Sequence, residues 1–179
     1  MAWTVPMTFT ANTVLTASQL NTHLRDNLLE TATAKASTSS QIFAAEGMFR
    51  IAARTPSVAS VGTSETTTSS EWVDLATPGP SVEVETGTRA LIWMSCNTQN
   101  TSLGGGNNIT YELSGDTERD PQYSTALRFD GVDEDDAMSF SMFDMNTTLT
   151  PGTNVFTMKY RRGSGTATFS NRQICVWPL

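Results

Sequence analysis

Few side chains in this sequence could catalyse a reaction. Its 179 residues include one histidine, His23, and two cysteines, Cys96 and Cys175. A histidine that acts as a general base needs a nucleophile or an acid within hydrogen-bond reach. Asp26, one turn away along a predicted helix, could accept a hydrogen bond from His23, but no nucleophile can be paired with it. We therefore interpret His23 as a surface or docking residue and predict that the chain is not an enzyme.

The cysteines and the acidic residues do not form a metal-binding pattern. Cys96 and Cys175 lie far apart in apolar runs without a neighbouring histidine, so we predict two buried, reduced thiols; a disulfide or a metal pair is the alternative. The run Asp133–Asp136, with Asp130 before it, is rich in oxygen ligands but lacks the D-x-D-x-D-G spacing of a helix-loop-helix calcium site. This run predicts a solvated hairpin loop, and we expect no metal and no cofactor.

The remaining motifs carry little binding chemistry. Gly104–Gly106 is not a phosphate loop, because no Lys-Ser/Thr pair follows it. Arg161 and Arg162 form a lone basic pair before a turn, and we expect both to be solvated. A net charge of −7 argues against nucleic acid as a partner, since phosphate binding needs clustered cations. Four aromatic side chains could stack on sugars or peptides, or could instead lie in the core or at a subunit interface: Trp72, Tyr111, Tyr123 and Tyr160.

Length and composition indicate a protein with a core of its own. A mass of 19.4 kDa suits one domain with an appendage, or one large β domain. No stretch of the sequence approaches the roughly 20 apolar residues that span a bilayer. The N-terminus lacks the basic start and apolar run of a secretory signal. We therefore expect synthesis in a cytoplasm and no membrane partner.

One helix is predicted near the N-terminus, after an extended segment. Thr16 is a good N-cap and Gln19 stands three residues later, which makes a capping box. Leu15 and Leu20 occupy the two positions of a hydrophobic staple. The helix should begin at Ala17 and fade near Lys35.

The apolar stripe of this helix does not predict a long coiled coil. Leu20, Leu24, Leu28 and Ala32 are spaced by four, so the stripe drifts by about 40° at each step instead of keeping a 3.5-residue repeat. A helix of roughly 18 residues is marginal alone in water. It must therefore dock on its own β domain, on copies of itself or on another protein.

The rest of the sequence predicts β structure. Residues 37–70 are expected to be a linker with short strands, and residues 71–179 carry strand after strand, separated by turns such as Thr77–Pro80. The segment Arg89–Asn97 is apolar on both faces, which predicts a central strand covered by a second sheet and by a neighbouring subunit. This pattern is typical of a sandwich or a closed barrel.

The first 36 residues carry a specific motif. L-N-T-H-L-R-D-N-L stands at Leu20–Leu28, and E-T-A-T-A-K-A stands at Glu30–Ala36. The segment Trp3–Ala36 resembles the N-terminal segment of small virion proteins of tailed phages of actinobacteria, described as minor tail or head-decoration proteins, although that family usually has proline where Thr33 stands. The resemblance implies that residues 1–36 anchor the chain to a phage capsid or tail protein. The side chains expected to dock are Trp3, Phe9, Leu15, Leu20, Leu24 and Leu28.

The C-terminal part resembles the jelly roll shared by tumour necrosis factor and the globular head of the first complement component. The matching pieces are T-P-G-P-S-V at 77–82, A-L-I-W-M-S at 90–95, L-T-P-G-T-N at 149–154, K-Y-R at 159–161 and the closing run 169–179. The resemblance implies an antiparallel jelly-roll sandwich over residues 71–179 with a central final strand, and a homotrimer. We expect the trimer interface to include Trp93, Tyr160 and Trp177.

Together these patterns predict a non-enzymatic structural component of a phage virion, assembled in the host cytoplasm. Its partners would be copies of itself and a capsid or tail protein. The alternative is a receptor-binding module on the virion that holds a host-surface glycan or protein through loops at 99–107 and 116–123.

Overall fold

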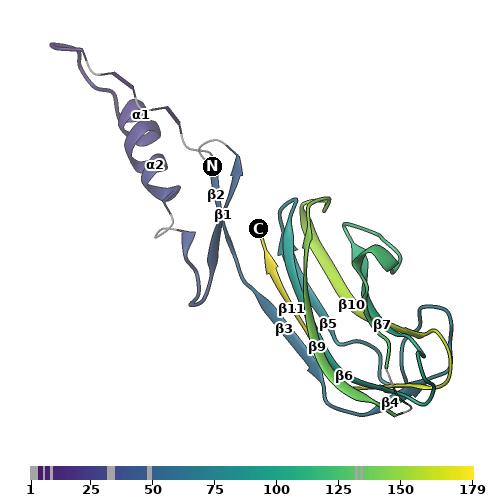
Figure 1. Ribbon diagram of the computed structural model, residues 1–179. Helices are drawn as coiled ribbons and strands as arrows, with labels where there is room; N and C mark the ends of the chain where they lie inside the picture. The colour runs from purple at the N-terminus through teal and green to yellow at the C-terminus, as the bar shows by residue number, and fades with distance from the viewer. Residues whose placement is uncertain are drawn as a thin grey trace. The chain divides into compact units, whose positions relative to one another are not determined.

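The computed structural model describes residues 4–5, 7–8, 10–31, 35–47, 50–131, 133 and 135–179 (Figure 1). The chain is mainly β, with 49% strand and 10% helix, as predicted. It divides into two compact units, Met1–Thr55 with Leu179 and Pro56–Pro178. Each unit is described by itself below.

The first unit contains one helical segment and one hairpin. The helix begins at Ala17, as predicted, and its middle turns are a π-helix. The hairpin strands are antiparallel and lie within residues 37–70, where we predicted short strands. Met48 and Phe49, between them, lie outside the described residues. The elements are α1 (Ala17–Leu20), η1 (Asn21–Arg25), α2 (Asp26–Leu29), β1 (Ile42–Gly47) and β2 (Arg50–Arg54).

The second unit is an antiparallel jelly-roll sandwich of two sheets (Figure 1). One sheet has the strand order β5 (Ser81–Thr86), β10 (Gly152–Arg162), β7 (Asn107–Gly115) and β8 (Leu127–Phe129). The other has the order β3 (Ser57–Val61), β11 (Ala167–Pro178), β6 (Ala90–Asn100) and β9 (Ala137–Asn146), and β4 (Glu65–Thr67) also pairs with β11. The final strand, β11, is central, as the resemblance implied.

The sandwich begins earlier in the chain than the sequence indicated. We predicted a linker with short strands over residues 37–70; two of the strands there, β3 and β4, pair with β11 and belong to the sandwich. Short, Ser- and Thr-rich strands look like linkers in the sequence, because their partner lies more than a hundred positions away at the C-terminus. This difference moves the start of the β domain to the segment after Arg54.

The core lies between the two sheets, and β6 shows how it is built. Ala90, Ile92 and Met94 point into the core and are fully buried, whereas Leu91 and Trp93 point outward and are half-buried. The predicted second sheet therefore covers one face of this strand. Coverage of the other face by a neighbouring subunit stays a prediction.

A β-bulge in β11 turns a charged side chain into this core. Ser170 pairs with Asn97 and Gln173 pairs with Ser95, so two residues of β11 oppose one of β6. The bulged residue Asn171 has a φ of 48°, in the left-handed region that asparagine tolerates better than most residues. Core-facing positions are odd-numbered before the bulge and even-numbered after it, and Arg172 is the first even-numbered one.

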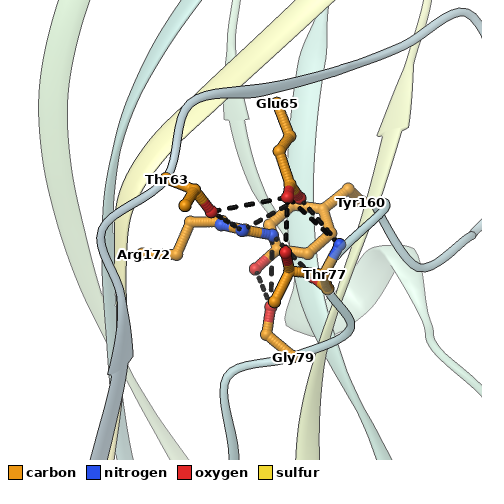
Figure 2. A network of polar contacts seen from close by, with 6 residues as sticks. All are labelled: Thr63, Glu65, Thr77, Gly79, Tyr160 and Arg172. Carbon is orange, nitrogen blue, oxygen red and sulfur yellow. Dashed lines mark hydrogen bonds and ion pairs between the residues drawn. The ribbon is translucent and has the colours of Figure 1, made fainter.

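Arg172 is completely buried at the centre of a polar network (Figure 2). Its Nη2 donates to Glu65 Oε2 at 3.0 Å and to Thr63 Oγ1 at 3.2 Å. Its Nη1 donates to the carbonyl oxygens of Thr77 at 3.2 Å and Gly79 at 3.4 Å. The guanidinium carbon lies 5.3 Å from the Tyr160 ring centroid. Arg172 on β11 thus connects β4, the turn Thr77–Pro80 and β10.

Glu65 supplies the charge that makes this burial tolerable. Its carboxylate accepts hydrogen bonds from the Thr77 hydroxyl at 2.6 Å and the Thr77 amide at 3.1 Å, in addition to the ion pair with Arg172. These hydrogen bonds, together with the nearby guanidinium, hold the Glu65 pKa below its ordinary value of 4.5. The carboxylate therefore stays ionised beside the buried cation.

We expect Glu65→Gln to lower the free energy of unfolding more than Arg172→Met does. The first change leaves a buried guanidinium without an opposite charge, whereas the second leaves a carboxylate that Thr77 still satisfies. Arg172→Met should cost about 1–3 kcal/mol, the penalty for buried acceptors that lose their donors. Urea unfolding at neutral pH measures both, with Glu71→Gln as an exposed control.

The stabilisation by Glu65 should depend on pH in the wild-type protein. Because the folded pKa of Glu65 is lowered, its contribution to stability is complete above the unfolded value and is lost as the pH falls through the folded value. The stability difference between wild type and Glu65→Gln should therefore shrink as the solution is acidified. A difference that stays constant to low pH would show that the carboxylate does not hold Arg172 in place.

Candidate functional site

The helix of the first unit begins with the predicted capping box. The Thr16 amide donates to Gln19 Oε1 at 2.9 Å, and the Gln19 amide donates to Thr16 Oγ1 at 3.2 Å. Two of the N–H groups that have no partner inside a helix are thereby satisfied. Local sequence alone fixes where this element starts.

Asn27 ties the N-terminal segment to this helix. The Thr4 amide donates to Asn27 Oδ1 at 2.8 Å, and Asn27 Nδ2 donates to the Thr4 carbonyl at 2.9 Å and to the His23 carbonyl at 3.1 Å. His23 Nδ1 lies 3.2 Å from the Val5 carbonyl. Asn27 is only 3% exposed. The amide side chain therefore binds the backbone of the extended segment as a neighbouring β-strand would.

The polar contacts leave the leucines of the helix facing solvent. The exposed fractions of Leu15, Leu20, Leu24 and Leu28 lie between 42% and 58%. Trp3 and Phe9, the other side chains that we expected to dock, lie outside the described residues. Docking by these side chains stays a prediction.

The π-helix changes the geometry of the leucine row. Within η1 the hydrogen bonds run from i to i+5, as from the Asp26 amide to the Asn21 carbonyl. A π turn holds more residues than an α turn. A step of four falls short of a full turn in a π-helix and exceeds it in an α-helix, so the π turn offsets part of the drift of Leu20, Leu24 and Leu28, which we call the leucine row.

A second exposed apolar surface covers the outer side of the β3–β11–β6–β9 sheet. In register across the four strands stand Val58, Cys175, Trp93 and Phe143, and the next row holds Trp177, Leu91 and Met145. The rings of Trp93 and Phe143 stack with centroids 6.4 Å apart, and Phe143 is 68% exposed. We call these seven residues the outer apolar face. We did not predict Val58 and Phe143 at this surface, because strand pairing sets the register that aligns them.

The prediction that Tyr160 lies in a trimer interface is corrected by its position. Its side chain is fully buried in the core, and its hydroxyl donates to the Gly79 carbonyl at 2.7 Å. Burial raises the pKa of this phenol. The alternation of Phe156, Met158 and Tyr160 along β10 was the signal for an inward-facing position. Trp93 and Trp177 do lie on the outer apolar face, and their role in a trimer stays a prediction.

The two cysteines are free and lie on opposite faces of the same sheet. Cys96 is buried in the core, and burial raises the pKa of its thiol to about 12. Cys175 is only half-buried, and its sulfur accepts a hydrogen bond from Trp177 Nε1 at 3.1 Å. The alternative of a disulfide between them does not occur in this fold.

The acidic run forms a loop tied by its own backbone. The Asp133 amide donates to Asp136 Oδ2 at 2.9 Å, and the Asp135 amide donates to the Asn100 carbonyl at 2.9 Å. Within the described residues, no group of three histidine, cysteine, aspartate or glutamate side chains is placed to hold a metal ion.

The four candidate binding aromatics separate into two groups. Tyr111 is buried in the core, like Tyr160, and its hydroxyl donates to Asp144 Oδ2 at 2.5 Å. Trp72 and Tyr123 instead lie together at the surface, with ring centroids 5.5 Å apart. The fold thus brings together two of the aromatics that the sequence analysis considered for ligand stacking.

Comparisons with known proteins do not identify a family. No protein-family model matches the sequence, and no curated protein sequence matches it. Across the described part of the chain, every helix is too short or too polar to cross a membrane.

Solved structures give distant likenesses only. A structure of infectious bursal disease virus, Gx strain, matches 70% of this chain with 13% identity and a TM-score of 0.39, and the chain spans 34% of that protein. TmCBM61 in complex with β-1,4-galactotriose matches 69% with 12% identity and a TM-score of 0.32, over 88% of its own length. The Tobacco streak virus coat protein matches 68% with 12% identity and a TM-score of 0.27, over 85% of its length. Likenesses this distant assign no function.

We expect Asn27→Ala to release the N-terminal segment from the helix. The change removes both hydrogen bonds to Thr4 and leaves the capping box intact. Hydrogen exchange of the Thr4 amide should become about tenfold faster, since two hydrogen bonds are lost. Asn21→Ala, a change of the same residue type at an exposed position on the helix, is the control. Unchanged exchange at Thr4 would contradict the role of Asn27.

Proposed function

We propose that this chain is a non-enzymatic structural component of a phage virion, a head-decoration or minor tail protein. Residues 1–36 dock on a capsid or tail protein, and the sandwich domains associate as a homotrimer. One observation carries the proposal: the leucines of the helix face solvent. The helix already has a complete cap, and its polar side already holds the N-terminal segment, so neither contact uses the leucines.

The energetics of the helix support a docking partner. The described helical elements run from Ala17 to Leu29, close to the length below which isolated helices are marginal in water. Burying one leucine side chain contributes about 1.5–3 kcal/mol. The three exposed leucines of the row, Leu20, Leu24 and Leu28, therefore offer a partner several kcal/mol of binding free energy. The motif Leu20–Leu28, which resembles the virion family, holds both these leucines and the polar residues that fix the N-terminal segment.

The outer apolar face supports association of the sandwich domains. Its seven residues contain no charge, and they lie in adjacent rows on neighbouring strands. Contiguous exposed apolar surface of this kind is typical of interaction sites, whereas single exposed apolar residues are ordinary. Copies of one chain that share such a face can close a symmetric ring, in which the same residues are covered in each subunit.

Docking through the leucine row can be tested with particles. Leu20→Ala combined with Leu24→Ala should weaken binding to heads or tails from a phage that lacks this protein by at least about tenfold, because two buried leucines are lost. The sandwich should keep its unfolding midpoint. Leu103→Ala, which removes another exposed leucine from a loop of the second unit, is the control. Unchanged binding by the double variant would refute docking through this row.

The trimer has a separate test. Light scattering should give three times 19.4 kDa, and Phe143→Arg should give a monomer because it places a charge in the outer apolar face. Iodoacetamide should modify Cys175 in the monomeric variant and not in the trimer, whereas Cys96 should stay unmodified in both while they are folded. A wild-type monomer at micromolar concentration with a reactive Cys175 would end the trimer proposal.

A further inference from the structure

We propose that the outer side of the other sheet, β5–β10–β7–β8, holds an acidic glycan, a sugar chain that carries carboxylates, at a cluster formed by Trp72, Arg161 and Tyr123. This aromatic–arginine cluster lies on a different sheet from the outer apolar face. The inference does not depend on trimer formation or on docking by the helix.

Strand pairing brings Trp72 to Arg161. Val73 forms an isolated antiparallel bridge with Tyr160, with hydrogen bonds of 2.9 and 3.0 Å between their backbones. Residues next to a bridged pair face the opposite side of the sheet. Since Tyr160 points into the core, Trp72 and Arg161 point outward together.

A short loop brings in Tyr123. It opens the 3₁₀ helix η2 (Tyr123–Thr125), which follows β7. The Thr110 hydroxyl on β7 contacts the Thr125 hydroxyl at 2.9 Å and donates to the Thr125 carbonyl at 3.1 Å. These contacts fix the loop over the sheet. The Tyr123 ring consequently lies beside Arg161, although it remains 59% exposed.

The guanidinium of Arg161 is held by the two rings and not by a carboxylate. Its central carbon lies 4.4 Å from the Tyr123 ring centroid and 5.5 Å from that of Trp72. Within the described part of the chain, Arg161 forms no ion pair, and its buried Nε has no hydrogen-bond partner. Lys159, two residues earlier on the same strand, contrasts with it, because its Nζ binds both Asp74 at 2.7 Å and Glu112 at 3.1 Å.

These groups match the chemistry of an acidic sugar. A fixed guanidinium can bind a carboxylate through two parallel hydrogen bonds, and its position against the rings limits the entropy lost on binding. A pyranose ring has an apolar C–H face that can lie on the exposed tyrosine or tryptophan ring, and hydroxyl groups that the phenol can reach. A nucleic-acid strand instead needs a basic groove along its backbone. The net charge is −7, and Lys159 and Arg128 are already paired with carboxylates. Among the described residues of this face, Arg161 therefore remains as a cation without a carboxylate, which suits one acidic sugar.

Calorimetric titration of the full chain with trigalacturonate tests the proposal, with galactotriose as the neutral counterpart. Trigalacturonate should bind at least about tenfold more tightly than galactotriose, and Arg161→Gln should remove that difference. Tyr123→Ala should weaken the binding of both sugars. Arg89→Gln is the control and should change the affinity for neither sugar. Arg89 is exposed and follows β5, whose Thr86 pairs with Gly152 at the opposite end of β10 from Arg161.

Three results would overturn the assignment. The first is no binding of trigalacturonate to wild type at millimolar concentration, and the second is equal binding by wild type and Arg161→Gln. The third is tighter binding of a thymidine oligonucleotide than of trigalacturonate, which would indicate a nucleic-acid site. Circular dichroism of each variant confirms folding, so that a loss of binding reports on the cluster itself.

Discussion

A guanidinium that is entirely out of contact with water constrains the second unit more than any other group. Arg172 can be buried only if acceptors surround it, and Glu65, Thr63, Thr77 and Gly79 provide them from separate segments. The bulge beside it turns the side chain inward and also shifts the alternation of β11. As a consequence Ile174 and Val176 fill the core, while Cys175 and Trp177 reach the outer apolar face. The bulge at Asn171 thus places both Arg172 in its network and Cys175 and Trp177 on the outer apolar face.

The first unit is built differently: its local hydrogen bonds are satisfied, but its leucines remain exposed. Thr16 and Gln19 satisfy the start of the helix, and Asn27 satisfies both backbone groups of Thr4. Polar residues therefore fix the conformation, and the leucines do not. These hydrogen bonds restrict the conformations of a helix that is marginal in length, so less conformational entropy is lost when a partner buries the leucines.

The sequence was informative wherever structure depends on near neighbours. The capping box, the start of the helix at Ala17 and the strand at β6 follow from local patterns and were predicted. The bulge at Asn171, the contact of Trp72 with Arg161 and the row from Val58 to Phe143 depend on pairing between distant strands, which composition and periodicity do not encode. Arg172 was missed for the same reason, since a charged residue in a strand usually predicts solvent. Tyr160 was misplaced although its alternation with Phe156 indicated the core.

The thiol of Cys96 has a consequence for chemical ageing. Oxidants and electrophiles attack the thiolate form, and burial raises the pKa of Cys96 to about 12, which keeps its thiol protonated near neutral pH. The sulfur belongs to the core cluster that also contains Ile92 and Met94, and Cys96 is only 2% exposed. The two thiols of the sandwich therefore differ: burial protects Cys96, whereas the half-buried Cys175 is the cysteine that oxidants reach more easily.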